Sequence, residues 1–290
     1  MKTFNAFTGD LKIRLIRLRA RINKSVFVGG EILRSAFSPK PKLNILFSVK
    51  PAWEPNIRIG FRPTRHHLLF DAFTDENIEK SDLAVPLTMK DLKYLSSRHK
   101  LAERNLIPIP DLAAIEICDD KYLFYQTLKE RGFGDYLPRI GAKLPYPYIL
   151  KKRVAEDGDN CYVIFNAADE KSHEAQLSDP EYFSQEIIAG HNEYATHILL
   201  KDGKIQSCIN IKYTFKEELP IKGQNTYISR EISGCPYLDL FTQMLNAAGF
   251  EGLCCVNYKV RDYQPYVFEI NPRFGGSLSP FFFSFVSKLN

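Results

Sequence analysis

The fold is decided by the stretch Val267-Phe268-Glu269-Ile270-Asn271-Pro272-Arg273-Phe274-Gly275-Gly276-Ser277, near the end of the 290-residue chain. Successive side chains of an extended strand point to opposite faces, so Glu269 and Asn271 share one face while Phe268 and Ile270 share the other. A carboxylate beside an amide oxygen, followed at once by an arginine and two glycines, is unusual at a strand end. The pattern therefore predicts a ligand-binding site here and not a plain edge strand.

A second strand, residues 253–260, precedes this stretch and is joined to it by a short turn. If the hairpin is centred on Tyr263, Asn257 lies directly opposite Glu269, with about 5 Å between their Cβ atoms. Glu269, Asn271 and Asn257 then offer three hard oxygen donors, which suit Mg²⁺ when phosphate oxygens and water complete its shell. Because this set holds one negative charge, the phosphates of a nucleotide must supply most of the charge that holds the metal.

The residues from Glu269 to Ser277 resemble the metal-binding strand of the ATP-grasp ligases, which include biotin carboxylase, D-alanine–D-alanine ligase and carbamoyl-phosphate synthetase. That family most often has Asp or Glu as its first metal ligand. Here the residue is Asn257, which is similar to the glutamine of carbamoyl-phosphate synthetase. The resemblance covers residues 80–285. It implies an ATP-grasp fold of α/β and α+β type, with a small N-terminal α/β (pre-ATP-grasp) domain and two lobes that clasp ATP together with Mg²⁺, or Mn²⁺ in its place.

The resemblance and the composition together predict how the chain is divided. The expected parts are a basic N-terminal segment (1–41), a pre-ATP-grasp α/β domain (42–115) and an ATP-grasp domain (116–290). The last is expected to comprise a small lobe (116–190) and a C-terminal lobe with the metal site (191–290).

Local patterns predict several elements. Residues 43–49, 56–61 and 80–87 read as strands, and Thr88 is expected to cap a helix over residues 89–97. Asp119 or Asp120 is expected to cap a helix that Gly132 stops.

Further along, the dipeptide Asp202-Gly203 predicts a hairpin turn. Residues 216–237 are expected to form a polar loop that helps to recognise the acceptor substrate. Residues 238–248 are expected to form a helix.

The resemblance also assigns roles to individual residues. Lys121 and Lys151 inherit contacts with the ATP phosphates, and Lys212 follows a strand where many members place another basic group, although a solvated lysine fits equally well. Arg273 is expected to stabilise the acyl phosphate and the tetrahedral oxyanion, which makes it the candidate catalytic residue.

The nucleotide's base and sugar are assigned to the segment 183–194. Gln185 is expected near the purine amino group. Glu186 and Ile188 are expected to offer backbone groups to the purine, and Glu193 to bind the ribose hydroxyls.

The resemblance implies an ATP- and Mg-dependent carboxylate–amine ligase, which activates a carboxylate as an acyl phosphate for attack by an amine or another nucleophile. Residues 153–160 depart from the family pattern, because they hold only Gly158 together with three acids where members carry several glycines. This departure leaves open an ATP-grasp-like module that binds nucleotide without turnover and acts as a sensor or scaffold.

Charge is concentrated at the N-terminus. Residues 1–50 hold eleven Lys/Arg against two acids, whereas the rest of the chain holds 28 basic and 32 acidic residues. Residues 11–24 are both basic and amphipathic, so contact with an acidic surface is predicted. A third alternative for the function of the chain is therefore an adaptor that binds a membrane surface or nucleic acid through this segment. A surface helix packed on the body is equally compatible with the pattern.

Other features narrow the class of protein. The six cysteines show no Cys-x-x-Cys pair or zinc spacing, which is typical of reduced thiols in a cytoplasmic protein. No apolar run approaches the ~20 residues of a membrane span, and no secretory signal is recognised at the start. Small-molecule carboxylate and amine substrates are the expected partners, and a homodimer is left open.

Overall fold

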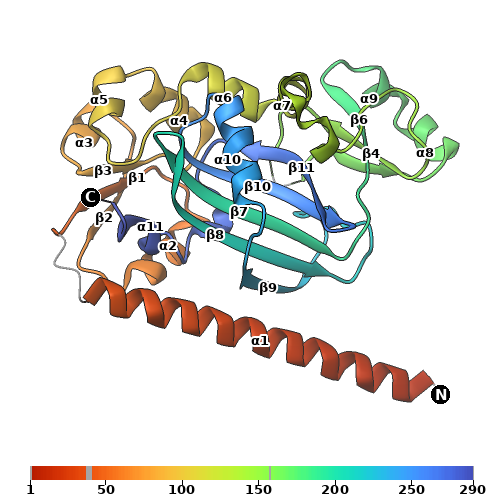
Figure 1. Cartoon of the computed structure of the whole chain (residues 1–290), viewed down its shortest axis with the longest axis horizontal. Helices are drawn as coiled ribbons and strands as arrows, with labels where there is room; N and C mark the ends of the chain where they lie inside the picture. The colour runs from red at the N-terminus through yellow and green to blue at the C-terminus, as the bar shows by residue number, and fades with distance from the viewer. Residues whose placement is uncertain (1, 37–40, 157, 290) are drawn as a thin grey trace.

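The computed structural model describes residues 2–36, 41–156 and 158–289, with side chains in the first range described for residues 11 and 13–33. Met1, residues 37–40, Asp157 and Asn290 lie outside the described residues, so the expectations that include them are untested there. Figure 1 shows one long helix, α1 (Lys2–Ala36), along the edge of a body that contains three sheets. None of the described helices combines the length and the apolarity that crossing a membrane requires.

The first sheet lies within residues 44–85 and is parallel, with strand order β2-β1-β3. Its elements and the helices that follow are β1 (Asn44–Phe47), α2 (Glu54–Phe61), β2 (His67–Phe70), α3 (Asp75–Glu79), β3 (Leu83–Val85), α4 (Met89–Ser96), α5 (His99–Arg104), α6 (Leu112–Asp119) and α7 (Lys121–Leu128). The two expected helix caps are present: Thr88 accepts the backbone N–H of Asp91, and Asp120 accepts those of Tyr122 and Leu123.

The strand expected over residues 56–61 was wrong, because this segment is helix α2. Ile57, Ile59 and Phe61 occupy alternate positions, which imitates a strand. The helix instead buries Ile57, Gly60 and Phe61, which have helical spacing, and leaves Ile59 half exposed. Pro55 lies in the first turn, where its fixed φ favours a helix and its missing N–H costs nothing.

The remaining two sheets are antiparallel. The smaller has the order β5-β4-β6, and the larger has the order β11-β10-β7-β8-β9. Their strands, with the helices between them, are β4 (Tyr148–Lys152), β5 (Cys161–Ile164), α8 (Ala167–Ser172), α9 (Glu174–Ser178), β6 (Tyr182–Glu186), β7 (Asn192–Lys201), β8 (Lys204–Phe215), β9 (Tyr227–Ser233), α10 (Leu238–Ala247), β10 (Gly252–Arg261) and β11 (Gln264–Asn271). The predicted Asp202-Gly203 turn is confirmed, but the predicted polar loop over residues 216–237 contains β9.

The five-stranded sheet is the central layer of the body, and it buries a core on each face. Helices α6, α7 and α10 pack on one face, where Cys254 and Val256 of β10 contact them. Cys255, which lies between these two residues in the strand, points to the core on the opposite face. That core includes residues of β1, α2 and the C-terminal segment. The adjacent cysteines Cys254 and Cys255 therefore point to opposite faces of the sheet.

The hairpin of β10 and β11 brings Asn257 opposite Glu269, as predicted. The turn is one residue tighter than expected, because Arg261 pairs with Gln264 across Asp262-Tyr263. A bulge at Phe268 then adds one residue to β11 and restores the register, since Tyr258 pairs with Val267 and Asn257 with Glu269.

The bulge also changes which side chains share a face. Phe268 was expected on the same face as Ile270, and this was wrong: Val267 and Ile270 enter the core, whereas Phe268 and Glu269 both line a cleft. In a β-bulge two consecutive residues oppose one partner residue, so strict alternation fails at that point.

Helix α1 packs along β9 and the C-terminal segment. Arg17 Nε donates to the Ile228 carbonyl oxygen at 3.1 Å, and the Phe27 ring meets the Phe281 ring edge-on at 5.9 Å. Glu31, the one acid between residues 11 and 33, is buried on this side. Residues 2–36 of the basic N-terminal segment therefore form a helix that is docked on the body.

The last described segment, residues 274–289, includes the short helix α11 (Phe283–Val286) and joins the first sheet to the central one. Phe282 is fully buried and its ring contacts those of Phe47, Phe61 and Phe274 at centroid distances of 5.1–6.2 Å.

We expect Phe282→Ala to lower the free energy of unfolding by about 3–5 kcal/mol, because the lost ring leaves a cavity between two layers. Phe165→Ala, at a ring that is 56% exposed, is the matched control and should change it by less than about 0.5 kcal/mol. Urea denaturation followed by circular dichroism measures both. Equal stability of the two variants would contradict the central position of Phe282.

Candidate functional site

A cleft of about 790 Å³ lies between the three-stranded sheet of β4–β6 and the face of the central sheet opposite α10. Six positively charged side chains line it, which are Lys121, Lys151, Lys222, Arg230, Lys259 and Arg273. Four acids line it too, namely Asp159, Glu186, Glu193 and Glu269. The excess of positive charge makes the cleft suitable for a polyanionic ligand.

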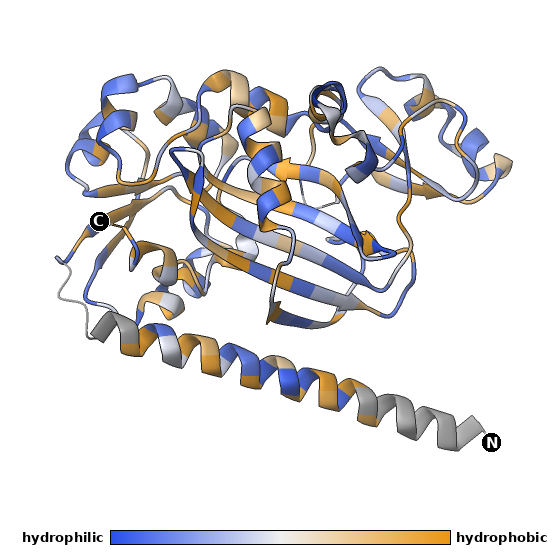
Figure 2. Ribbon diagram, viewed as in Figure 1, coloured by the Kyte–Doolittle hydropathy of each residue, from blue (hydrophilic) through white to orange (hydrophobic). Residues whose placement is uncertain are grey.

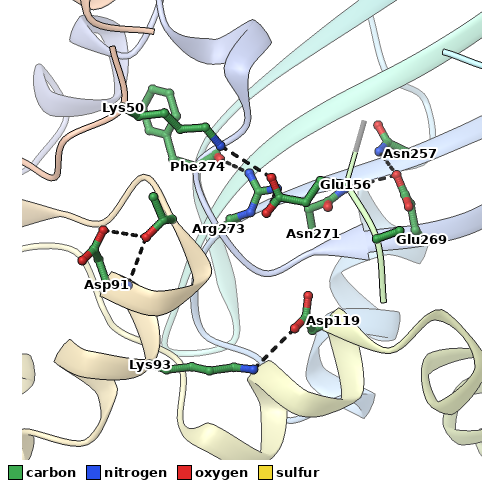
Figure 3. A network of polar contacts seen from close by, with 12 residues as sticks. Lys50, Asp91, Lys93, Asp119, Glu156, Asn257, Glu269, Asn271, Arg273 and Phe274 are labelled. Carbon is green, nitrogen blue, oxygen red and sulfur yellow. Dashed lines mark hydrogen bonds and ion pairs between the residues drawn. The ribbon is translucent and has the colours of Figure 1, made fainter. Parts of the chain in front are cut away.

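Glu269 stands at the floor of this cleft, on the strand end that the sequence singled out. Asn257 Nδ2 donates to Glu269 Oε1 at 2.6 Å, and Asn271 Nδ2 donates to the same oxygen at 3.3 Å. Figure 3 shows the three side chains together, with Arg273 further along the same chain segment. The hairpin therefore gathers the three predicted metal ligands at one point.

Lysines surround the Glu269 carboxylate. Lys121 Nζ lies 3.6 Å from Glu269 Oε2. Exclusion of water raises the pKa of Glu269, but the charges of Lys121, Lys151 and Lys222 and the hydrogen bond from Asn257 outweigh this and lower it to about 2. The carboxylate is thus ionised at every pH at which the protein is expected to work.

Lys222 is a member of this group that the sequence did not reveal. It lies in the segment expected to be a polar loop, and its Nζ donates to Asn257 Oδ1 at 2.8 Å and contacts Glu193 Oε1 at 3.1 Å. Burial lowers the pKa of Lys222, but the neighbouring Glu193 raises it above its ordinary value, so the ammonium stays charged. A single lysine in a polar stretch carries no pattern that would have identified it.

The two lysines predicted to contact phosphates are both buried at the cleft. Lys121 Nζ donates to the backbone carbonyl of Ala155 at 2.8 Å, which holds the acidic loop against the start of α7. Lys151 Nζ donates to Gln185 Oε1 at 3.2 Å and lies 5.3 Å from the centre of the Phe268 ring. Burial lowers the pKa of Lys151.

The residues assigned to the base and the ribose also line the cleft, namely Gln185, Glu186, Ile188 and Glu193. The Glu186 carboxylate forms ion pairs with two arginines, with Arg139 Nε at 3.1 Å and Arg261 Nη1 at 2.8 Å. Its side chain is therefore engaged within the protein and is not directed at a ligand. Its backbone N–H donates to the Arg139 carbonyl oxygen at 2.7 Å.

Lys259 is a second residue that the sequence reading missed. Its Nζ donates to the Ile188 carbonyl oxygen at 3.1 Å, and burial lowers its pKa. A signal for it was present, because Lys259 follows Asn257 by two residues in the same strand and therefore shares its face.

Lys212, expected near the phosphates, does not join the others. It precedes Tyr213, which lines the cleft, and therefore points to the other face of β8. Its Nζ pairs with Glu231 Oε1 at 3.6 Å, outside the residues that line the cleft.

Arg273, the candidate catalytic residue, is buried and holds a carboxylate of the protein itself. Its Nη2 lies 2.8 Å from Glu156 Oε1, and Lys50 Nζ lies 3.6 Å from the other oxygen of Glu156 (Figure 3). The acid belongs to the glycine-poor loop 153–160. The arrangement shows that the Arg273 guanidinium can bind a carboxylate at the mouth of the cleft.

The paired glycines after Arg273 are explained by close approach. A Cβ at Gly275 would lie 2.5 Å from Cε1 of His197, and one at Gly276 would lie 2.9 Å from the Trp53 ring. His197 is fully buried, which lowers its pKa to about 3, and its Nε2 bonds Ser277 Oγ at 2.7 Å. The buried, neutral His197 ring thus packs against the backbone at Gly275 and holds Ser277 by a hydrogen bond.

The oxygen donors around Glu269 fit a divalent metal that shares its ligands with phosphate. Among the described residues, no three side chains from His, Cys, Asp and Glu group together as a metal site of their own. Glu269, Asn271 and Asn257 offer one carboxylate and two amides, a set that fits Mg²⁺ shared with phosphate oxygens. The Asn257 oxygen already accepts from a cation, Lys222, so it faces positive charge.

We expect Gly275→Ala to destabilise the protein by about 1–3 kcal/mol, because the buried His197 ring must move to admit a methyl group. Gly141→Ala is the matched control, since an added Cβ there meets nothing within 4 Å. Urea denaturation compares them, and equal unfolding midpoints would mean that the loop has room the structure does not show.

Comparisons with known proteins agree with this geometry. A family model described as an ATP-grasp domain matches residues 118–277, more than half of the chain. Comparison with curated protein sequences gives no match.

Solved structures share the fold at low sequence identity. The D-alanine–D-alanine ligase from Bacillus anthracis matches with a TM-score of 0.55 and 16% identity, covering 81% of this chain and 88% of that one. The L-amino acid ligase from Bacillus licheniformis gives 0.56 and 17%, with coverages of 84% and 70%. The N5-carboxyaminoimidazole synthetase from Staphylococcus aureus, complexed with ADP, gives 0.53 and 16%, with coverages of 83% and 73%. The ATP-grasp fold expected from the sequence is thereby confirmed, and the chain belongs to the ATP-grasp family.

Proposed function

We propose that this chain is an ATP- and Mg²⁺-dependent ligase that activates a carboxylate as an acyl phosphate and joins it to an amine. The observation that carries the proposal is the set of three lysines, Lys121, Lys151 and Lys222, around one ionised carboxylate on the floor of the cleft. The lysines suit a triphosphate, and the carboxylate provides a place for a cation among them. The ligases named above, which share the fold, support this proposal.

The chain's own residues have distinct tasks in this scheme. Mg²⁺, held by Glu269, Asn271 and Asn257, would neutralise charge on the phosphates. Lys121 and Lys151 orient the phosphate chain, which lowers the cost of bringing two anions together.

The remaining tasks fall to residues around the lysines. Gln185 and the backbone of Glu186 and Ile188 hold the base, and Glu193 holds the ribose. Because Arg273 binds a carboxylate in this structure, it is suited to holding the substrate carboxylate, and then the acyl phosphate, at the same position.

A second candidate function is a nucleotide-binding module without turnover. The pairing of Glu156 with Arg273 favours it, since the proposed catalytic guanidinium is engaged by the protein's own loop. In this alternative the cleft binds nucleotide and reports its presence through the loop.

ADP release with a panel of carboxylic acids and amines tests the ligase. We expect Mg²⁺-dependent ADP release with one acid–amine pair and a loss of about tenfold or more in Glu269→Gln, because even residues that only support a metal ligand are worth about 10–100-fold. Glu103→Gln, an exposed acid on α5, is the matched control and should match the unmodified chain. Nucleotide binding without ADP release on any pair would favour the sensor, and unchanged turnover in Glu269→Gln would contradict the metal assignment.

A pH series tests the role of Lys151. Because burial lowers its pKa, the ammonium loses its proton at lower pH than an exposed lysine, and ATP affinity should fall by about two- to tenfold as pH rises from about 8 to about 10. Lys151→Arg should flatten this fall, since a guanidinium keeps its charge. Calorimetry measures the affinity, and the neighbouring Lys152→Arg is the control. An unchanged alkaline fall in Lys151→Arg would contradict a phosphate contact at Lys151.

A further inference from the structure

Helix α1 presents apolar side chains on two opposite faces. One face packs on the body through Ala20 and Phe27. The other face is open to solvent, with six large apolar side chains that are 53–70% exposed, and these define the outer stripe: Leu11, Leu15, Leu18, Ile22, Val26 and Leu33.

The outer stripe is continuous along the helix. At 100° per residue, its six members fall within an arc of about 80°, and they span about 33 Å along the axis. Figure 2 shows apolar positions recurring along the whole described part of α1, interspersed with hydrophilic ones. Isolated exposed leucines are common on protein surfaces, but an aligned row of this length marks an interaction surface.

Basic residues border the outer stripe. On the helical wheel Arg21 lies on one side and Arg19 on the other, and the Arg19 side chain is 78% exposed although it contacts Glu231 at 4.0 Å. Glu31, the only acid from residue 11 to residue 33, is buried against the body. The outward face therefore combines an apolar centre with positive flanks.

We propose that this face of α1 binds an anionic lipid surface. The helix would lie in the plane of the headgroups, with the outer stripe in the boundary of the acyl chains and the arginines against lipid phosphates. Helix α1 does not cross the bilayer, because it lacks the apolarity of a spanning helix. Figure 1 places α1 at the edge of the molecule, so its outward face can approach a flat surface while the body stays on the other side.

Two other partners fit the surface less well. A second copy of α1 packed on the outer stripe would bring the arginine flanks of both helices together, whereas Glu31, the one acid between residues 11 and 33, is buried on the opposite side of the helix. Nucleic acid would satisfy the arginines but leave the row of leucines in water, and the outer stripe contains no aromatic residue that could stack on a base.

Co-sedimentation of the full chain with vesicles tests the proposal. Vesicles of phosphatidylcholine with about one quarter phosphatidylglycerol should bind the protein, and pure phosphatidylcholine should bind it at least about tenfold less. Raising the salt from about 0.1 M to about 0.5 M should weaken binding several-fold, because the arginine contacts are screened.

Variants separate the apolar and the charged contributions. Leu15→Gln/Leu18→Gln/Ile22→Gln should reduce binding by about tenfold or more, since its three side chains no longer gain from burial. The matched control substitutes three apolar side chains of 37–44% exposure away from α1, as Leu69→Gln/Leu112→Gln/Leu177→Gln, and should bind like the unmodified chain.

Two further variants complete the test. Val26→Gln, at the most exposed residue of the outer stripe, should give a smaller loss in the same direction and serves if the triple variant folds poorly. Arg19→Gln/Arg21→Gln, which removes the two arginines that flank the outer stripe, should reduce the salt dependence.

The proposal is overturned if the unmodified chain ignores anionic vesicles, or if the triple variant binds them unchanged. It is also overturned if the outer stripe instead holds two copies together, which sedimentation velocity would show as a dimer lost in the triple variant without vesicle binding. Binding to single-stranded RNA in the absence of vesicle binding would overturn it in favour of nucleic acid.

Discussion

The ionised Glu269 among its lysines is the interaction on which the rest of the site depends. A carboxylate that is largely withdrawn from water tends to take up a proton, and a lysine in the same place tends to lose one. Glu269 remains ionised because the surrounding lysines lower its pKa to about 2, and the amides of Asn257 and Asn271 both donate to Oε1, the oxygen that does not face Lys121. Removing one charge would leave the others uncompensated, so the cluster behaves as a unit. A polyanion and a divalent cation that arrive together preserve this balance.

The loop of residues 153–160 connects that cluster to the first sheet. Lys121 holds the Ala155 carbonyl, and Glu156 reaches both Arg273 and Lys50. Lys50 follows β1 of the first sheet and Arg273 follows β11 of the central sheet. Glu156 therefore contacts residues that extend from both sheets. In the proposed function, a substrate carboxylate at Arg273 would compete with Glu156 for the same donors. By linkage, release of the loop and substrate affinity would then influence each other equally. The acidic composition that sets this loop apart from glycine-rich ones thus has a physical consequence.

Much of the site could be predicted because it lies on regular strands. Asn257 was correctly placed opposite Glu269, although the tighter turn and the bulge at Phe268 each shift the register by one residue and cancel. A strand ending in Lys151 was enough to place that lysine. The bulge at Phe268 could not be predicted, since no residue there demands it, and it reversed the face of that ring. Lys222 was missed because a loop residue reaches a site through the path of the backbone, which has no period. Lys212 was expected to follow the strand, but it lies within β8 next to Tyr213. Neighbouring residues of a strand point to opposite faces, so the Lys212 side chain is turned away from the cleft. In α2, the apolar residues at alternate positions led to the prediction of a strand, although Pro55 favours the start of a helix and the buried residues have helical spacing.

The C-terminal segment has a consequence for how the protein reaches this structure. Phe47 of β1 completes its packing on Phe282, about 235 residues later in the chain. The first sheet has three short strands and shares one core with residues 281–286. Its native packing can therefore form only after those residues have been synthesised. Contacts of such long sequence separation slow folding, because a large loop must close before they form. During synthesis the early strands and the basic helix therefore spend time as exposed apolar and cationic segments, the state in which a chaperone or an anionic surface would first meet them.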